Sequence, residues 1–237
     1  YEIAKCFLEH GIHVICDKPL ALRTEEAEEL ARIAEECGLL FCITYSYTGY
    51  ALIRQAREMI RAGAIGDILH VRVQHPEDWV ISGAVDGKVD TSAWRFQPEK
   101  VGSSLCTNDL GTHAEQMVAQ FTGLHVKRVL AMMDTYPRDL PLDTNVNVLM
   151  DFGRRRNRYA LGIPDCDWTR VRQRHLRHRH RAFSNIYRSF CNVLSDRKAG
   201  RENTTDTFPT VEDGVLGVRF VEACVRSHTA GGVWMDV

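Results

Sequence analysis

A lysine follows directly after a short apolar segment near the beginning of the sequence. Residues 13–16 read HVIC, which is typical of a buried strand, and Asp17-Lys18-Pro19 comes next. The carboxyl ends of strands in a parallel sheet face the ligand crevice, and Pro19 biases the residue before it towards an extended backbone. Lys18 could therefore donate hydrogen bonds to a hydroxyl or carbonyl oxygen of a bound molecule. The alternative is a surface lysine ahead of a helix.

A second candidate is the run DLGTH, which places Asp109 four residues before His113. On one turn of a helix, residues four apart share a face. Imidazole titrates near neutrality, so His113 can accept and return a proton, and a neighbouring carboxylate can orient the ring and stabilise its charged form. Gly111 lies between them and would allow a ligand to approach closely. The alternative is a helix-capping aspartate beside a histidine that has no chemical role.

Aromatic residues beside polar groups give weaker signals at two further places. Trp94 and Arg95 are adjacent, and an indole plane beside a guanidinium could line a site for a sugar or a cofactor. A packed tryptophan with an arginine that reaches solvent is the alternative. Tyr47 follows an apolar strand, where its hydroxyl could reach a polyol, and a partly buried aromatic pair with Tyr45 fits the sequence equally well.

Helices and apolar strands alternate in the first 47 residues. Residues 2–10 and 24–37 have helical apolar spacing, and each is followed by glycine, which favours a helix end. Residues 13–16 and 39–44 are almost wholly apolar, as strands covered on both faces of a parallel sheet are. Residues 1–47 are therefore expected to form a short parallel α/β piece.

The pattern changes after residue 47. Helices are predicted over 51–62, 110–121, 183–194 and 210–227, and strands over 67–75, 125–135 and 144–152. The strands alternate between apolar and polar residues, which is typical of antiparallel sheets with one open face. The apolar positions of the first helix are expected to face inward: Leu52, Ala56, Met59 and Ile60. The predicted fold class is α/β, with a short parallel sheet followed by an α+β domain whose open sheet is mostly antiparallel.

The composition excludes several classes of protein. The 237 residues carry 30 Lys and Arg against 31 Asp and Glu, and 44% are hydrophobic, as in ordinary globular chains. No apolar run is long enough to span a membrane, and no secretory leader pattern is present. The eight cysteines include no CxxC pair and no spacing typical of zinc ligands, which favours a reducing, cytoplasmic compartment and no metal site.

One segment has an unusual composition. Residues 154–181 contain ten Arg, three His and only two acidic residues, without strand alternation or a helical apolar stripe. Three interpretations are open: a shifted reading frame, a loop with a solvated basic face, and a nucleic-acid-binding arm. The abrupt change and abrupt recovery of composition favour the first, and nucleic-acid binding is the least favoured.

The order and spacing of these motifs resemble the glucose–fructose oxidoreductase/inositol dehydrogenase (Gfo/Idh/MocA) family. The matching stretches are HVICDKPLAL at 13–22, AGAIGDILHVRV at 62–73, AWRFQP at 93–98, NDLGTHAEQM at 108–117 and FPTVEDGVLGVRFVEA at 208–223. The resemblance covers nearly the whole chain except 154–181. It implies a Rossmann domain that binds NAD or NADP, of which residues 1–47 would be the C-terminal part, and a substrate and oligomerisation domain over 48–237.

The implied activity is hydride transfer between the nicotinamide and a hydroxyl-bearing carbon of a sugar or cyclitol. By this resemblance Lys18 is the lysine of the family's Glu-Lys-Pro motif, close to the nicotinamide and the substrate hydroxyl. Asp17 and Pro19 complete that motif at the cofactor, although Asp17 stands where the family usually has Glu. A homo-oligomer is also implied.

The resemblance assigns the remaining candidates as well. His113 would accept the substrate proton during oxidation, and Asp109 would position or tune it. Trp94 and Arg95 would lie near the cofactor or the substrate. Tyr47 is the remaining candidate for binding the substrate.

Two departures from the family pattern leave the activity open. The sequence contains no GxGxxG turn to hold a pyrophosphate, which is consistent with an N-terminal truncation of about 70–80 residues. Residues 154–181 replace sheet strands that the resemblance leads us to expect. The chain is therefore expected to be either an oxidoreductase that is incomplete in this sequence or a non-catalytic remnant that binds no cofactor.

Overall fold

The computed structural model describes residues 1–77, 80, 93–153, 158–162 and 172–237. Its contacts divide the chain into two compact units, each discontinuous in sequence. The first unit comprises Tyr1–Ile65 and Arg170–Leu216, and the second comprises Gly66–Thr169 and Gly217–Val237. In the described part of the chain, no helix combines the length and the apolar character needed to cross a membrane.

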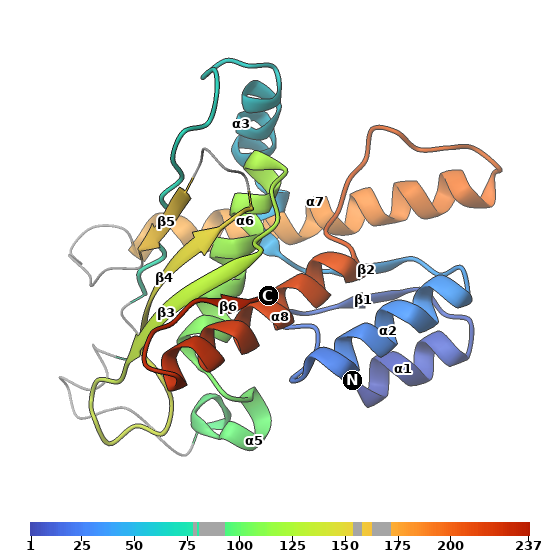
Figure 1. The fold of residues 1–237 in the computed structure, drawn as a ribbon. Coiled ribbons are helices and arrows are strands. Elements are labelled where there is room, and N and C mark those ends of the chain that lie inside the picture. Colours follow the sequence, from blue (N-terminus) through green and yellow to red (C-terminus); the bar gives the residue numbers. More distant parts are fainter. Residues whose placement is uncertain (78–79, 81–92, 154–157, 163–171) are drawn as a thin grey trace. The chain divides into compact units, whose positions relative to one another are not determined.

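The first unit contains a two-stranded parallel sheet with α1 and α2 packed beside each other (Figure 1). The elements are α1 (Glu2–Glu9), β1 (Val14–Cys16), α2 (Thr24–Glu36) and β2 (Phe41–Ile43). β1 and β2 are parallel, with Val14 opposite Phe41, so the predicted alternation of helix and strand is confirmed. β2 is fully buried, whereas Ile15 of β1 is 38% exposed.

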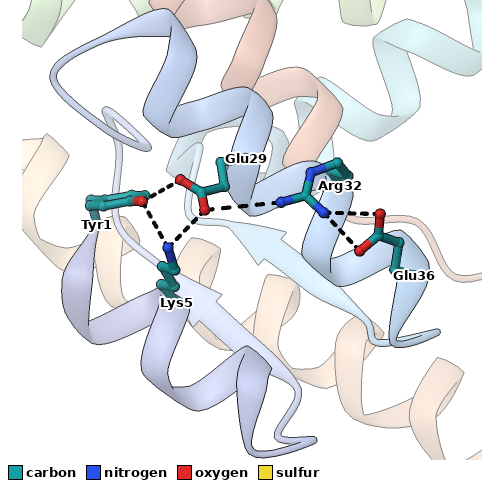
Figure 2. Close-up of polar contacts among 5 residues, drawn as sticks. All are labelled: Tyr1, Lys5, Glu29, Arg32 and Glu36. Carbon is teal, nitrogen blue, oxygen red and sulfur yellow. Dashed lines mark hydrogen bonds and ion pairs between the residues drawn. The ribbon is translucent and has the colours of Figure 1, made fainter.

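An ionic network joins α1 to α2 (Figure 2). Lys5 Nζ donates to Glu29 Oε1 at 2.7 Å, and the Tyr1 hydroxyl also donates to Glu29. Arg32 of α2 pairs with Glu36 at 2.8 Å. The hydrogen bond from Lys5 is the main reason that the pKa of Glu29 lies below its ordinary value.

We expect Glu29→Gln to lower the midpoint of thermal unfolding by no more than a few degrees near neutral pH, because this network remains partly in water. The pKa of Glu29 is lower in the folded state than in the unfolded state, so its stabilisation is present above the unfolded pKa and is lost as pH falls through the lowered one. Melting curves of the two proteins should therefore converge on acidification. Glu35→Gln, at an exposed position of the same helix, is the control, and a loss from Glu29→Gln that does not depend on pH would contradict this account.

α7 (Arg172–Lys198) packs against the 3₁₀ helix η1 (Ser46–Gly49) within the first unit. Asn185 Nδ2 of α7 donates to the Gly49 carbonyl oxygen at 2.8 Å. The apolar contacts beside this junction come from Cys42, Ile186 and Phe190, all of which are buried. The periodicity that predicts a helix over 183–194 is therefore confirmed.

α3 (Ala51–Arg61) follows η1 and is tied to it by Arg54, whose Nε donates to the Thr48 carbonyl oxygen at 3.0 Å. The predicted inward orientation is wrong for Leu52 and Met59, whereas Ala56 and Ile60 are half-buried. α3 has no buried residue, and Leu52 and Met59 are 77% and 52% exposed. An apolar stripe shows which face of a helix could be covered, but no described part of the chain covers this one.

The second unit contains an antiparallel sheet with the strand order β5-β4-β3-β6 (Figure 1). The strands are β3 (Arg128–Asp134), β4 (Asn145–Asp151), β5 (Arg158–Gly162) and β6 (Met235–Asp236). β3 and β4 pair along their full length, with Val129 opposite Met150. These two residues lie on the buried face, whereas Met132 and Leu149 are 65% and 43% exposed on the other. The predicted open antiparallel sheet, and with it the fold class, is confirmed.

Helices cover the buried face of this sheet. The remaining elements are η2 (Trp94–Phe96), α5 (Pro98–Val101), η3 (Thr107–Gly111), α6 (Thr112–Thr122) and α8 (Val211–Thr229). Ala114 and Val118 of α6 and Phe220 of α8 belong to one core cluster with the strands. Burial raises the pKa of the Cys106 and Cys224 thiols in this cluster, so both pack as small apolar groups.

Two regions differ from the prediction. Residues 67–75 form no strand, although the alternation persists, with Val71 and Val73 half-buried against the core. Within the Arg-rich segment 154–181, for which the sequence predicts no regular element, Arg158–Gly162 forms β5 and α7 begins at Arg172. The other parts of that segment lie outside the described residues.

Candidate active site

In the first unit, Asp17-Lys18-Pro19 lies at the carboxyl end of β1, as the sequence predicts. Asp17 Oδ1 accepts hydrogen bonds from the Lys18 N–H at 2.9 Å and from Thr44 Oγ1 at 2.6 Å. The Thr44 N–H in turn donates to the Cys16 carbonyl oxygen at 2.9 Å. Asp17 therefore ties the end of β1 to the end of β2, and it fixes the backbone from which the half-buried Lys18 side chain extends.

Tyr47 is half-buried in η1, also in the first unit. Its ring stacks on that of Tyr50, with centroids 6.0 Å apart and planes 21° from parallel. Tyr45, by contrast, is 1% exposed and belongs to the core. The structure thus pairs Tyr47 with Tyr50.

In the second unit, Trp94 and Arg95 lie on η2 and face solvent together. Trp94 is 53% exposed, and the Arg95 guanidinium carbon lies 4.6 Å from the centre of the indole ring. Phe96, which is 4% exposed, anchors this short helix in a small apolar cluster. Trp94 is therefore not a packed core residue, and the stacked pair offers a flat cationic surface.

Asp109 and His113 lie on either side of a change in helix type. The residues Thr107–Gly111 form a π-helical turn, η3, which leads directly into α6. The Thr112 N–H donates to the carbonyl oxygen of Thr107, five residues back. The sequence predicts an α-helical turn here, but the turn is wider. In a π-helical turn, a step of four residues, as from Asp109 to His113, is less than one full turn. Such turns occur frequently at functional sites.

His113 is 5% exposed, and its ring lies close to another imidazole, that of His75. The rings of His75 and His113 have centroids 6.0 Å apart and planes inclined by 57°. His75 Nε2 lies 3.6 Å from Glu77 Oε1. His75 belongs to no motif of the sequence, but it lies in phase with the half-buried Val71 and Val73, and that alternation places it on the inner face.

A buried carboxylate holds the segment that leads into η3. Asp143 is 8% exposed, and its Oδ1 accepts the Leu105 N–H at 2.8 Å. Its Oδ2 accepts both the N–H and the Oγ1–H of Thr107 at 3.3 Å, and its backbone carbonyl accepts the Cys106 N–H at 3.2 Å. Burial raises the pKa of Asp143 above its ordinary value, and these donors act in the opposite direction.

Gly111 has a packing role in the structure. A Cβ atom at this position would lie 3.0 Å from the Thr107 methyl group and 3.5 Å from the Phe220 ring. Residues of η3 and α8 thus fill the space beside Gly111. This packing explains the glycine without the predicted approach of a ligand. Gln116, one turn further along α6, is 1% exposed, and its Nε2 has no hydrogen-bond partner among the described residues.

The structure thus places the predicted site residues in two groups. Asp17, Lys18, Pro19 and Tyr47 belong to the first unit, and Trp94, Arg95, Asp109 and His113 belong to the second. Within the second unit it adds His75 and Asp143. The meeting of Lys18 and His113 at one substrate oxygen stays a prediction, because these residues belong to different units.

Comparison with known proteins defines the class of this chain. The family model described as the GFO/IDH/MocA C-terminal domain matches residues 53–179, and the model described as an oxidoreductase family with an NAD-binding Rossmann fold matches residues 1–45. The chain therefore belongs to the Gfo/Idh/MocA family of NAD-binding oxidoreductases.

Individual relatives agree with this assignment. The chain is 26% identical to an uncharacterized oxidoreductase, YfiI, of Bacillus subtilis, and the match covers 100% of this chain and 74% of that protein. It is 31% identical to the levoglucosan dehydrogenase of Pseudarthrobacter phenanthrenivorans over 60% of this chain and 35% of that enzyme. Its fold matches that of an inositol dehydrogenase homolog of Azotobacter vinelandii, crystallised with NAD⁺, with a TM-score of 0.81, 27% identity, and coverage of 100% of this chain and 75% of the other.

The family implies NAD or NADP, and the residues present fit one end of that cofactor. Lys18 lies at the carboxyl end of β1, the edge of a parallel sheet at which ligands bind. The sequence contains no GxGxxG turn to receive the pyrophosphate. The described residues therefore supply a cation for a ligand at this edge of the sheet.

Proposed function

We propose that the protein transfers a hydride between NAD(P) and a hydroxyl-bearing carbon of a sugar or cyclitol. The observations that support this proposal are a lysine, Lys18, at a parallel-strand end in one unit and a histidine, His113, at the start of α6 in the other, in a chain of this family. The names of two relatives, a levoglucosan dehydrogenase and an inositol dehydrogenase homolog, support an anhydrosugar or a cyclitol as the substrate class.

In this proposal NAD(P), when bound, accepts the hydride. The residues of the chain stabilise the charge that develops on the substrate as the hydride leaves. His113 accepts the hydroxyl proton as the carbon is oxidised, which prevents positive charge from building up on that carbon. The Lys18 ammonium stabilises the developing alkoxide. Asp109 orients the His113 ring and stabilises its protonated form.

The domain assignment is part of the same proposal. Residues 1–47 would be the C-terminal part of a Rossmann domain, and residues 48–237 the substrate domain with its open sheet. That open face, which carries Met132 and Leu149, would support a homo-oligomer. The contact of Trp94, Arg95 and Tyr47 with cofactor or substrate is also proposed.

The test is an assay of the purified chain with NAD⁺ and with NADP⁺, against myo-inositol, levoglucosan and a panel of aldoses. We expect the absorbance of reduced nicotinamide to appear with at least one of them, and NADH fluorescence to change on titration with the protein. Lys18→Met should abolish turnover, whereas Lys127→Met, at an exposed lysine of the second unit, should leave it unchanged. Absence of turnover with every substrate would contradict the proposal.

The alternative that the sequence leaves open is a chain that binds no cofactor. The NADH titration separates the two. Saturable binding in the micromolar range would count against the remnant. No change in fluorescence up to millimolar NADH would favour it.

A further inference from the structure

Three consecutive backbone amides ahead of the candidate catalytic helix converge on one residue. The Leu105 N–H donates to the Asp143 carboxylate, and the Cys106 N–H donates to the Asp143 backbone carbonyl oxygen. The Thr107 N–H is shared between the Asp143 carboxylate at 3.3 Å and Ser104 Oγ at 3.0 Å. The Ser104 side chain also hydrogen-bonds to that carboxylate. The partners are themselves buried, with Ser104 and Thr107 fully inaccessible to solvent. A network of this kind defines one backbone geometry, because any displacement would leave buried polar groups without partners.

The π turn begins at the last of these residues. Thr107 opens η3, and its carbonyl oxygen accepts the five-residue hydrogen bond from Thr112. Asp109 lies inside this turn and His113 lies directly after it. The hydrogen bonds to Asp143 therefore fix the start of η3. The conformation of η3 in turn sets how Asp109 and His113 are oriented relative to each other.

We infer that Asp143 is a positioning residue, which holds η3 in its wide π-helical form and thereby sets how Asp109 addresses the His113 ring. The inference rests on the proposed function, since it concerns the same site. It extends that proposal to a residue that touches neither cofactor nor substrate and acts through the backbone of Leu105 and Thr107.

The geometry indicates which substitution is informative. Asn at position 143 keeps the shape of the side chain, but its amide can present only one oxygen, so an NH₂ group would face the Thr107 N–H or the Leu105 N–H. With the NH₂ group on the Leu105 side, two buried donors would oppose each other. With it on the Thr107 side, the Thr107 N–H would keep only Ser104 Oγ as its acceptor, so either orientation weakens the attachment of the turn to residue 143. Thr107→Val is a milder variant, which removes only the hydroxyl donor at 3.3 Å and keeps the size of the side chain.

The experiment combines structure and kinetics on the whole chain. In Asp143→Asn we expect the hydrogen bond from the Thr112 N–H to the Thr107 carbonyl to be lost, as followed by amide NMR. We also expect kcat to fall about 10- to 100-fold while KM for the cofactor stays nearly unchanged, because misplacement of a reacting group acts on the chemical step. Thr107→Val should show a smaller change in the same direction. Asp134→Asn, at an exposed carboxylate of the same unit, is the matched control and should change neither reading.

The outcomes separate this inference from the proposed function. If the wild type has no turnover, the proposed function fails, while the NMR reading of Asp143→Asn still supports or refutes positioning. If Asp143→Asn keeps both the five-residue hydrogen bond and kcat, the inference is overturned. It is also overturned if Asp143→Asn alters kcat only in proportion to a loss of folded protein in melting curves. Should Asp143→Asn not fold, Thr107→Val decides by the same two readings.

Discussion

Replacing His113 by glutamine is expected to lower kcat by about 100- to 10,000-fold, the range that a positioned general base contributes. His113 is 5% exposed, so glutamine is chosen because it keeps a polar side chain of similar reach in a buried position. The hydroxyl proton then has no acceptor of suitable pKa, and charge builds up on the carbon that loses the hydride. KM for the cofactor should change little, because the loss falls on the chemical step.

The control for this variant is His125→Gln. His125 is an exposed histidine of the same unit, just after α6, and its substitution should leave kcat unchanged. Melting curves of both variants establish that the second unit is folded. If His113→Gln retained wild-type kcat in a folded protein, the assignment of the base would be wrong, and His75, whose ring lies 6.0 Å from that of His113, would be the next residue to test.

Gly49→Ala is expected to have the largest effect on stability. A Cβ atom at Gly49 would lie 2.0 Å from the carbonyl oxygen of Ala182 and 2.7 Å from its carbonyl carbon. These are backbone atoms of α7, so no side chain can rotate away, and η1 must separate from α7 to admit the methyl group. We expect the free energy of unfolding to fall by about 3 kcal/mol, which is a decrease of about 6–12 °C in melting temperature for a chain of this size.

Gly200→Ala is the matched control. Gly200 has a φ of +68°, but a Cβ there would meet nothing within 4 Å, so its substitution introduces backbone strain without a steric clash. That strain costs about 1 kcal/mol. Chemical denaturation of both variants gives the comparison, and a Gly49→Ala protein as stable as Gly200→Ala would refute the close packing of η1 on α7.

The elements whose apolar residues have a clear period were predictable from the sequence. The alternation over 144–152 corresponds to β4, in which Val146, Val148 and Met150 are buried, and the helix over 210–227 starts as predicted. There the Thr210 N–H donates to the Asp213 carboxylate at 2.8 Å. Periodicity shows which face of an element is apolar, but it does not show whether that face is covered or whether the element pairs with a neighbour. It could not show that the apolar stripe of α3 has no described cover, nor that 67–75 would alternate without pairing as a strand.

The Arg-rich segment shows the opposite failure. β5 pairs with β4 over five residues, and its backbone hydrogen bonds do not depend on which side chains it carries. A segment with few apolar residues can therefore complete a sheet when a neighbouring strand offers a free edge. Sequence periodicity has no access to such a pairing, since the partner lies elsewhere in the chain.

In the candidate site, the residues found from sequence are those with reactive groups in short motifs. Lys18 sits next to a strand end, and Asp109 and His113 lie four residues apart, so local spacing was enough to select them. Asp143 carries no such signal. It follows the run LPL ahead of a strand, where an aspartate ordinarily terminates a turn, and only the fold brings it to Leu105 and Thr107. Thr44 carries no such signal either, because its partner Asp17 follows a different strand, β1.

The wide turn at η3 also explains how residues spaced four apart can all face the same core. Cys106, Leu110, Ala114 and Val118 all contact the same apolar cluster, at steps of four residues. In a regular α-helix each such step overshoots a full turn by about 40°, so three steps would carry the last contact about 120° away from the first. The π-helical turn has more residues per turn, so it reduces this rotation and keeps all four side chains against the same cluster. Removing a single residue from this stretch would rotate everything after it, and the imidazole would leave its place even though no reactive group had been altered.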